Sequence, residues 1–331
     1  MKVTVILCTY NGEQSVSSAL QSLAAQELSG SIEWEVLVVD NNSTDRTRQV
    51  VEEFCRQHPQ RFRYLFEPKQ GKSYALNLGL REAHGEVIAF TDDDVTMEPT
   101  WLQNLTACLG NGEWAGAGGR TLAERGFVPP DWMGLESRRA VAPLAIFDIG
   151  PEARQFREAP YGNNMAFRRE VFEKHGGFDT GLGPCAGSPR PQKNEDSEFG
   201  VRVLAAGERL RYEPSAVVYH HIPPRRLRKE YFLNWWFDKA RADVRAFGIP
   251  HPSWCIAGIP ARLFRRLAVW TLRWMLTAET RRRFECKQTV WALLGQIQEC
   301  YSLHLAENGS GHQAPLRQSG LPKARERNSG S

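Results

Sequence analysis

The sequence predicts an α/β protein built around a parallel sheet. Short, nearly continuous apolar runs alternate with segments that place apolar residues at helical spacing, and polar or turn-forming residues follow each run. Such runs are typical of strands covered on both faces, and their alternation with helices is typical of parallel sheets. The predicted strands span residues 3–7, 34–39 and 86–90, and the predicted helices span 15–26, 46–57 and 74–83.

Composition excludes fibrous and globally disordered proteins. The 331 residues are 41% hydrophobic and 24% charged, which is typical of a globular chain with a substantial core. The net charge of +4 is too small to indicate a nucleic-acid partner. Seven scattered cysteines without a CxxC pair fit neither a disulfide framework nor a zinc site, so we expect a cytoplasmic protein. No apolar stretch reaches the roughly 18 residues that a membrane-spanning helix needs.

Polar clusters follow the predicted strands, at the edge where parallel sheets bind ligands. Thr9, Tyr10 and Asn11 follow the first strand, Asp40 follows the second, and three consecutive aspartates at 92–94 follow the third. Adjacent carboxylates repel one another unless a cation lies among them, so the triplet indicates a site for Mg²⁺ or Mn²⁺. A solvated acidic loop is the alternative interpretation.

Three further positions either carry chemistry or stabilise local structure. Lys72 lies at the start of a helix, where a cation and the helix dipole both suit a phosphate. Glu195 and Asp196 begin an amphipathic helix, where an acidic side chain is either an N-terminal cap or a general base. His220 and His221 follow an apolar run, and such a pair is either structural or a source of a metal-ligating imidazole.

Eight sequence blocks, taken in chain order, resemble the family 2 glycosyltransferases. They are CTYNG (8–12), VVDNNSTD (38–45), GKSYALNLG (71–79), FTDDDV (90–95), GNNMAFRR (162–169), GGFD (176–179), ED (195–196) and YH (219–220). The resemblance covers about residues 3–235. It implies the GT-A fold, a Rossmann-like α/β/α sandwich, and inverting transfer of a sugar from a nucleotide-sugar donor, with a UDP-sugar expected. The implied acceptor is a hydroxyl of a glycan or lipid-linked molecule in cell-surface polysaccharide or glycoconjugate synthesis.

The resemblance also implies roles for individual residues. The implied donor contacts are Thr9, Tyr10, Asn11 and Asp40 at the base and ribose, Lys72 at the phosphates, Asp92 and Asp93 in the aspartate triplet, and Asn163 and Asn164 near the sugar. Asp92 and Asp94 would form the DXD motif and, with His220, hold a Mn or Mg ion. His220 is preferred over His221 because it directly follows a tyrosine, as the family's ligand usually follows an aromatic residue. Asp196 would deprotonate the acceptor hydroxyl, and Glu195 would orient the acceptor or the base.

The chain divides into four predicted segments. Residues 1–110 would form the nucleotide-sugar-binding half of a GT-A domain, and residues 111–230 would form its acceptor and catalytic half. Residues 231–306 are rich in Arg and Trp and predict a helical C-terminal extension. Residues 307–331 have too few apolar side chains for a core and predict a disordered tail.

The predicted helix 260–276 is amphipathic and basic. Six apolar side chains share one arc of a helical wheel, namely Leu263, Phe264, Leu267, Trp270, Trp274 and Met275, and Arg262, Arg265, Arg266 and Arg273 share the opposite arc. Packing of the apolar arc on the catalytic domain is the simpler interpretation. Contact with an anionic membrane is the alternative, because Trp beside Arg suits a bilayer interface. It would place the protein peripherally at the inner face of the cell membrane.

Three other functional classes are the alternatives to glycosyl transfer. Residues 92–96 match the DxDxT pattern of haloacid-dehalogenase-like Mg-dependent phosphatases, but that motif normally follows the first strand. The second alternative is a non-catalytic module that binds a nucleotide-sugar or a membrane. Such a module would not need both Asp196 and the metal-binding carboxylates at 92–94. A nucleotidyltransferase would favour a Gly-rich basic loop after the first strand, and this sequence has none there.

Overall fold

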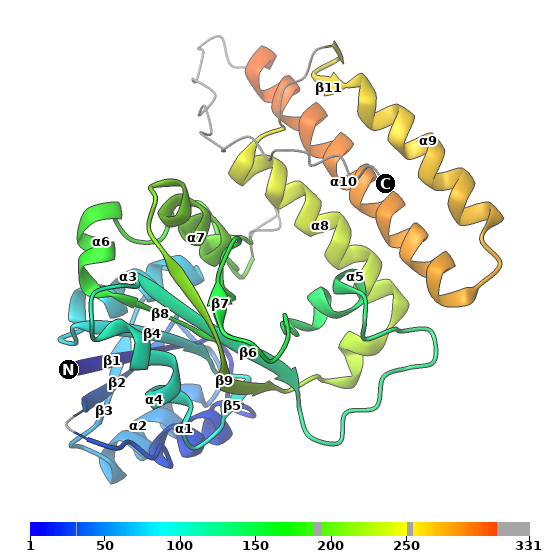
Figure 1. Cartoon of the computed structure of the whole chain (residues 1–331). Helices are drawn as coiled ribbons and strands as arrows, with labels where there is room; N and C mark the ends of the chain where they lie inside the picture. The colour runs from blue at the N-terminus through cyan, green and yellow to red at the C-terminus, as the bar shows by residue number, and fades with distance from the viewer. Residues whose placement is uncertain (31, 188–192, 250–253, 310–331) are drawn as a thin grey trace.

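The computed structural model describes residues 1–30, 32–187, 193–249 and 254–309 (Figure 1). Its first part contains β1 (Lys2–Thr9), α1 (Val16–Ala24), β2 (Glu33–Asp40), α2 (Thr47–Gln57), β3 (Phe62–Phe66), α3 (Lys72–Glu82) and β4 (Val87–Asp92). The three predicted strands and three predicted helices are confirmed, with ends that differ by up to two residues. Strand β3 is not predicted from the sequence, because Arg63 interrupts its apolar run and only Phe62 is fully buried. It pairs with β2 alone, at the edge of the sheet.

The chain then continues the same sheet with a different strand direction. The elements are β5 (Val95–Met97), α4 (Trp101–Thr106), η1 (Ala107–Leu109), β6 (Gly116–Ala123), α5 (Arg138–Val141), η2 (Ala142–Leu144), β7 (Arg154–Gln155), β8 (Met165–Arg168), α6 (Arg169–His175), α7 (Glu195–Ala205) and β9 (Leu210–His220). Within the described residues the strand order is β3-β2-β1-β4-β8-β6-β9-β5, with β7 also paired to β9. Strands β1 to β4 are parallel, as predicted, whereas β8 runs antiparallel to both β4 and β6. The sheet is therefore mixed beyond β4.

Two apolar layers cover the two faces of the sheet. Alternate residues of β1 point to opposite faces, so that Val5 and Leu7 lie in one core and Ile6 lies in the other. The first core is closed by α1, α2 and α4, and the second by α3, α6 and α7. The result is a three-layer α/β/α sandwich whose parallel strands end at one edge.

A helical extension follows the sandwich, as predicted. It contains η3 (Pro224–Leu227), α8 (Lys229–Phe247), β10 (Cys255–Ile256), β11 (Ile259–Pro260), α9 (Ala261–Leu276) and α10 (Thr280–Gly309). Helix α10 lies between α8 and α9, and Figure 1 shows the three helices side by side, beyond the sheet. The predicted disordered tail starts at residue 307, but α10 continues to Gly309. The rest of that predicted tail, residues 310–331, lies outside the described residues.

Helix α9 packs mainly on α10 rather than on the sandwich. Leu263 is buried there, and Leu267 and Trp270 are partly buried against the same cluster. Phe264 and Met275, which the helical wheel places on the same arc, remain exposed. Among the described residues, no helix combines the length and the apolar character that crossing a bilayer requires.

Candidate active site

Strand pairing gathers the predicted polar clusters at one edge of the sheet. Thr9 at the end of β1 lies opposite Asp40 at the end of β2. Cys8 lies opposite Asp92 at the end of β4. The first, second and third polar clusters of the sequence therefore meet, as expected for the carboxyl ends of parallel strands.

Asp93 faces back toward the end of β1. Its carboxylate accepts a short hydrogen bond from the Thr9 hydroxyl, which is itself buried. Burial and the neighbouring charge of Asp94 raise the pKa of Asp93 to about 7, against the opposing effect of the Thr9 hydrogen bond. Gly12 allows this approach, because a Cβ there would lie 2.3 Å from Asp93 Oδ2. Asp93 is thus placed to hold the β1 and β4 loops together.

Lys72 joins the aspartate triplet to the acidic pair on α7. Its Nζ lies 2.5 Å from Asp92 Oδ1 and 3.7 Å from Glu195 Oε1. Burial opposes the charge of Lys72, but the two carboxylates outweigh it and hold the pKa of Lys72 well above its usual range. Burial, followed by the charge of Asp196, raises the pKa of Glu195 to about 7, although Lys72 acts in the opposite direction. One ammonium group therefore connects motifs about a hundred residues apart in the chain.

Asp94 forms a second cluster with His220. Pairing of β5 with β9 sets Val95 opposite His220, and this places His220 Nε2 3.1 Å from Asp94 Oδ2. His221 points elsewhere and its Nδ1 lies 2.7 Å from Glu124. Burial alone would raise the pKa of Asp94, but His220 and then Arg226 lower it to about 2. The structure thus places His220, and not His221, beside Asp94.

The Asp94–His220 pair has donor atoms suited to a divalent cation. Two neighbouring ligands of an octahedral ion lie about 3 Å apart when each is about 2.0–2.1 Å from the metal. The measured 3.1 Å between Asp94 Oδ2 and His220 Nε2 matches that spacing. In the described part of the chain, no third His, Cys, Asp or Glu joins them, and Asp92 bonds to Lys72 instead. A cation held by these two side chains would need further oxygen ligands to complete its shell.

Asp196 lies at the start of α7 with its charge supported by the backbone. Its Oδ2 accepts the N–H of Gly162 at 2.8 Å, and its Oδ1 accepts the N–H of Ser197 at 2.6 Å. The side chain is only partly buried, whereas Glu195 is buried. Asp196 thus keeps lone pairs and solvent access that a general base needs.

Several residues that we predict to contact the nucleotide-sugar donor use their polar groups for hydrogen bonds within the chain. Asp40 accepts hydrogen bonds from the Ser43 N–H and the Tyr64 hydroxyl. Asn163 accepts one from Thr121. Asn164 accepts one from the Trp101 indole and donates two to the carbonyls of Arg120 and Ala216. These contacts favour positioning roles for the two asparagines, and their contact with a sugar stays a prediction.

The loop after β1 presents an accessible aromatic ring. Tyr10 is 40% exposed beside the buried Thr9. Asn11 has a left-handed backbone with φ of 51°, and its Oδ1 accepts the N–H of Thr44 at 2.8 Å. This contact joins the loops after β1 and β2 and leaves the Tyr10 ring available to stack on a planar ligand.

The sequence analysis missed Arg226. Its guanidinium lies 3.0 Å from His220 Nε2 and 3.4 Å from Asp94 Oδ2. The available signal was a basic pair, Arg225 and Arg226, only a few residues beyond the candidate metal-ligating histidine. Periodicity carries no information about which of the two turns inward.

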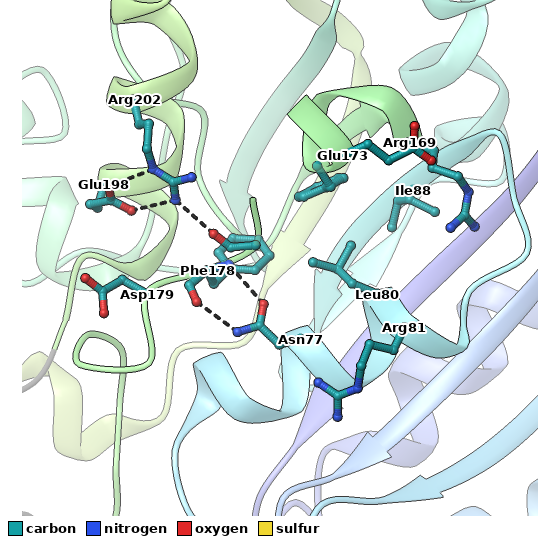
Figure 2. A pocket seen from close by; sticks show the side chains of 12 residues that line it. Asn77, Leu80, Arg81, Ile88, Arg169, Glu173, Phe178, Asp179, Glu198 and Arg202 are labelled. Atoms are coloured by element: carbon teal, nitrogen blue, oxygen red, sulfur yellow. Dashed lines mark hydrogen bonds and ion pairs between the residues drawn. The ribbon is translucent and has the colours of Figure 1, made fainter. Parts of the chain in front are cut away.

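A cavity of about 610 Å³ lies on another face of the sandwich (Figure 2). It is lined by residues of α3, β4, α6, α7 and the loop after α6, including Leu80, Ile88 and Phe178. Asn77 closes one side by donating to the Phe178 carbonyl and accepting the Phe178 N–H. None of the predicted site residues lines this cavity.

Comparison with known families identifies the class of this site. The model of glycosyl transferase family 2 matches residues 4–176. The chain belongs to this family. It is therefore a glycosyltransferase, as predicted, and the phosphatase, binding-module and nucleotidyltransferase alternatives are wrong.

Curated relatives are named for glycan synthesis. The glucosyl-dolichyl phosphate glucuronosyltransferase of Haloferax volcanii is 31% identical over 67% of this chain and 70% of that protein. The succinoglycan biosynthesis protein ExoM of Rhizobium meliloti is 26% identical over 68% and 69%. The probable glycosyltransferase YdaM of Bacillus subtilis is 28% identical over 72% of this chain, which spans 54% of YdaM.

Solved structures confirm the predicted GT-A fold. The mannosyltransferase PcManGT from Pyrobaculum calidifontis, solved with GDP-Man and Mn²⁺, has a TM-score of 0.54 and 22% identity over 95% of this chain and 76% of that one. TarS 1–349 from S. aureus, solved with UDP, has a TM-score of 0.50 and 16% identity over 96% and 95%. At these identities the likeness concerns the fold.

Proposed function

We propose that this enzyme transfers a sugar, with inversion, from a UDP-sugar to a hydroxyl of a glycan or lipid-linked acceptor in polysaccharide or glycoconjugate synthesis. One observation carries the proposal: Lys72 contacts both Asp92 and Glu195. The aspartate triplet and the acidic pair on α7 therefore belong to one site, as a single displacement reaction requires.

Asp196 acts as the base in this reaction. It accepts the proton of the acceptor hydroxyl, whose oxygen attacks the anomeric carbon as the bond from that carbon to the diphosphate oxygen breaks. The bonding electrons leave with the nucleoside diphosphate. The N–H groups of Gly162 and Ser197 hold the carboxylate in place. Glu195 and Lys72 orient this end of α7 and balance charge near the phosphates.

Asp94 and His220 are the residues that would hold Mn²⁺ or Mg²⁺. Such an ion neutralises negative charge that develops on the departing diphosphate. Asp92, which we also predict at the metal or ribose, is held by Lys72 at this edge. Tyr10 and Asn11 would contact the base and ribose from the loop after β1. The chemistry of the donor set, one carboxylate and one imidazole, suits Mn²⁺.

Nucleotide titration tests the proposal. We would titrate the full chain with UDP, GDP, CDP and dTDP, each with Mn²⁺ and with EDTA. Metal-dependent binding of UDP in preference to the others is expected, and Asp94→Asn should abolish that metal dependence. Binding of GDP alone would show that the donor carries guanine rather than uracil. No binding of any of the four diphosphates would refute the nucleotide-sugar reaction.

We further propose that α9 contacts an anionic membrane at the cytoplasmic face. Larger apolar side chains of this helix pack toward α10, at positions 263, 267, 270 and 274. Five others stay exposed: Phe264, Val269, Leu272, Met275 and Leu276. Leu276 is 74% exposed and Met275 is 63% exposed. Arginines at 262, 265, 266 and 273 border this surface and complement anionic headgroups. Figure 1 shows α9 on the far side of α10 from α8, where a flat surface could reach it.

Liposome flotation tests the membrane proposal. The full chain should float with phosphatidylglycerol vesicles at low salt and less at high salt, because salt screens the arginines. Replacing Leu272, Met275 and Leu276 together by Ser should abolish flotation. Val128→Ser is the control, because Val128 is 79% exposed but lies on a loop before α5. Equal flotation of the triple variant and the native chain would exclude α9 as the contact.

A further inference from the structure

Arg226 occupies the position at which the Asp94–His220 pair would hold a cation. One guanidinium nitrogen lies 3.0 Å from His220 Nε2, and another lies 3.4 Å from Asp94 Oδ2. These are the two atoms that we propose as metal ligands. Arg226 lies on η3, only six residues beyond His220, so it is tethered close to this pair.

The guanidinium contacts the same two atoms that a cation would bind. His220 Nε2 faces an acceptor, Asp94, and a donor, Arg226, at hydrogen-bond distance from both. If Nε2 carries a proton, it can donate to Asp94 but cannot accept from Arg226. If Nε2 has a bare lone pair, it can accept from Arg226 while a second N–H of the same guanidinium donates to Asp94, so the fork bridges the pair. His220 Nδ1 is buried and has no hydrogen-bond partner among the described residues, so it offers no compensating contact.

A divalent cation would bind the same two atoms. It would accept the Nε2 lone pair and the Asp94 oxygen at about 2.0–2.2 Å, where the guanidinium nitrogens lie 3.0 and 3.4 Å away. It would also bring a second positive charge next to Arg226, and like charges this close repel each other. Arg226 and the cation therefore exclude each other from the pair.

We propose that Arg226 is a built-in competitor for the metal position, displaced when the donor diphosphate arrives. This inference rests on the proposed function. A displaced guanidinium stays within reach of the site, where its planar fork suits a diphosphate. The donor therefore compensates the cost of moving Arg226, so the cation binds weakly alone and tightly with the donor. Removing the competitor raises the population of protein that can take the cation.

A metal titration without nucleotide tests this directly. We would follow free Mn²⁺ by electron paramagnetic resonance with the full chain, Arg226→Gln and Arg226→Lys. Arg226→Gln should bind Mn²⁺ about tenfold more tightly than the native chain. This factor corresponds to a native chain in which Arg226 leaves the Asp94–His220 pair open in about one molecule in ten. With UDP present, the difference should shrink or reverse, because the native arginine then contributes to diphosphate binding.

Arg225→Gln is the matched control. Arg225 is the neighbouring, exposed arginine on the same turn, so its removal changes the net charge equally. It should leave Mn²⁺ affinity unchanged. Arg226→Lys keeps the charge but loses the fork, and should give an intermediate affinity. Thermal unfolding of each variant verifies folding.

Two results would overturn the inference. Unchanged or weaker Mn²⁺ binding by Arg226→Gln would show that Arg226 does not compete. A native-like affinity of Arg226→Lys beside a tighter Arg226→Gln would show general repulsion between charges rather than occupancy of the pair. Metal-dependent UDP binding by the native chain with either result would leave the proposed function standing. Loss of that UDP binding would instead refute the metal role itself.

Discussion

Lys72→Met should make the stability of the protein depend on pH in a defined way. The Lys72 ammonium lies 3.7 Å from Glu195, a distance at which two unit charges interact by about 4 kcal/mol at an effective dielectric constant of about 20. The lysine side chain is 21% exposed, so solvent screens part of this interaction. We therefore expect the variant to lose about 2–3 kcal/mol of unfolding free energy above neutral pH.

The sign follows from the raised pKa of Glu195, which is about 7 in the folded chain. A carboxyl with a raised pKa in the folded state contributes stability at low pH that is lost as pH rises through that value. Without Lys72, the pKa of Glu195 rises further, so the free energy of unfolding of the variant continues to fall above pH 7. The part of the difference between the native chain and the variant that arises from Glu195 should thus be small near pH 5.5 and largest near pH 8.5. Lys72 also lies 2.5 Å from Asp92, so loss of that contact lowers stability further at both pH values.

Urea unfolding at these two pH values measures the effect. Lys69→Met is the control, because Lys69 is exposed and contacts the Tyr74 ring rather than the buried carboxylates. It should change stability little and equally at both values. An equal loss for Lys72→Met at pH 5.5 and pH 8.5 would refute the argument, since the lysine would then stabilise the fold without acting through Glu195.

Three further outcomes are expected. Asp196→Asn should reduce sugar transfer by about 10²–10⁴-fold while nucleotide affinity, measured by calorimetry, stays within about twofold, and a native-like rate would remove Asp196 from the base role. Glu299→Ala should lower the free energy of unfolding, measured in urea, by about 3–5 kcal/mol. The reason is that Glu299 is 2% exposed and lies 3.0 Å from Arg241 and 2.9 Å from Arg245 of α8. A loss below about 1 kcal/mol would contradict this. Gly12→Ala should weaken UDP binding, because the new Cβ displaces the Asp93 carboxylate, whereas Gly110→Ala, at an open position, should not.

The parallel half of the fold was predictable because its signals are local. Strands β1, β2 and β4 are covered on both faces and carry continuous apolar runs, and the helices between them carry the 3.6-residue period. Strand β3 was not predicted because it is short, lies at an edge of the sheet and has Arg63 within its apolar run. The reversal of β8 depends on which strands it meets after a long connection, and no period records that.

The candidate site was predictable as a set of positions rather than as a set of contacts. Motif blocks marked Thr9, the aspartate triplet and Asp196, but the same letters did not show that Asp92 would bond to Lys72 or that Asn164 would bond within the core. Those contacts depend on the relative placement of α3, β4, α4 and β8. Arg226 lay outside every block, and only folding of η3 beside β5 brings it to Asp94.

By itself the sequence determined the family, the parallel core, the helical extension and the edge of the sheet where the candidate site residues gather. Each of these follows from residue types at fixed local spacing, which the backbone period converts directly into faces and strand ends. Only the tertiary structure set His220 rather than His221 beside Asp94, brought the Arg226 guanidinium to this pair and left several apolar side chains of α9 exposed. These outcomes depend on distances between segments far apart in the chain, and such distances arise only when the layers pack together.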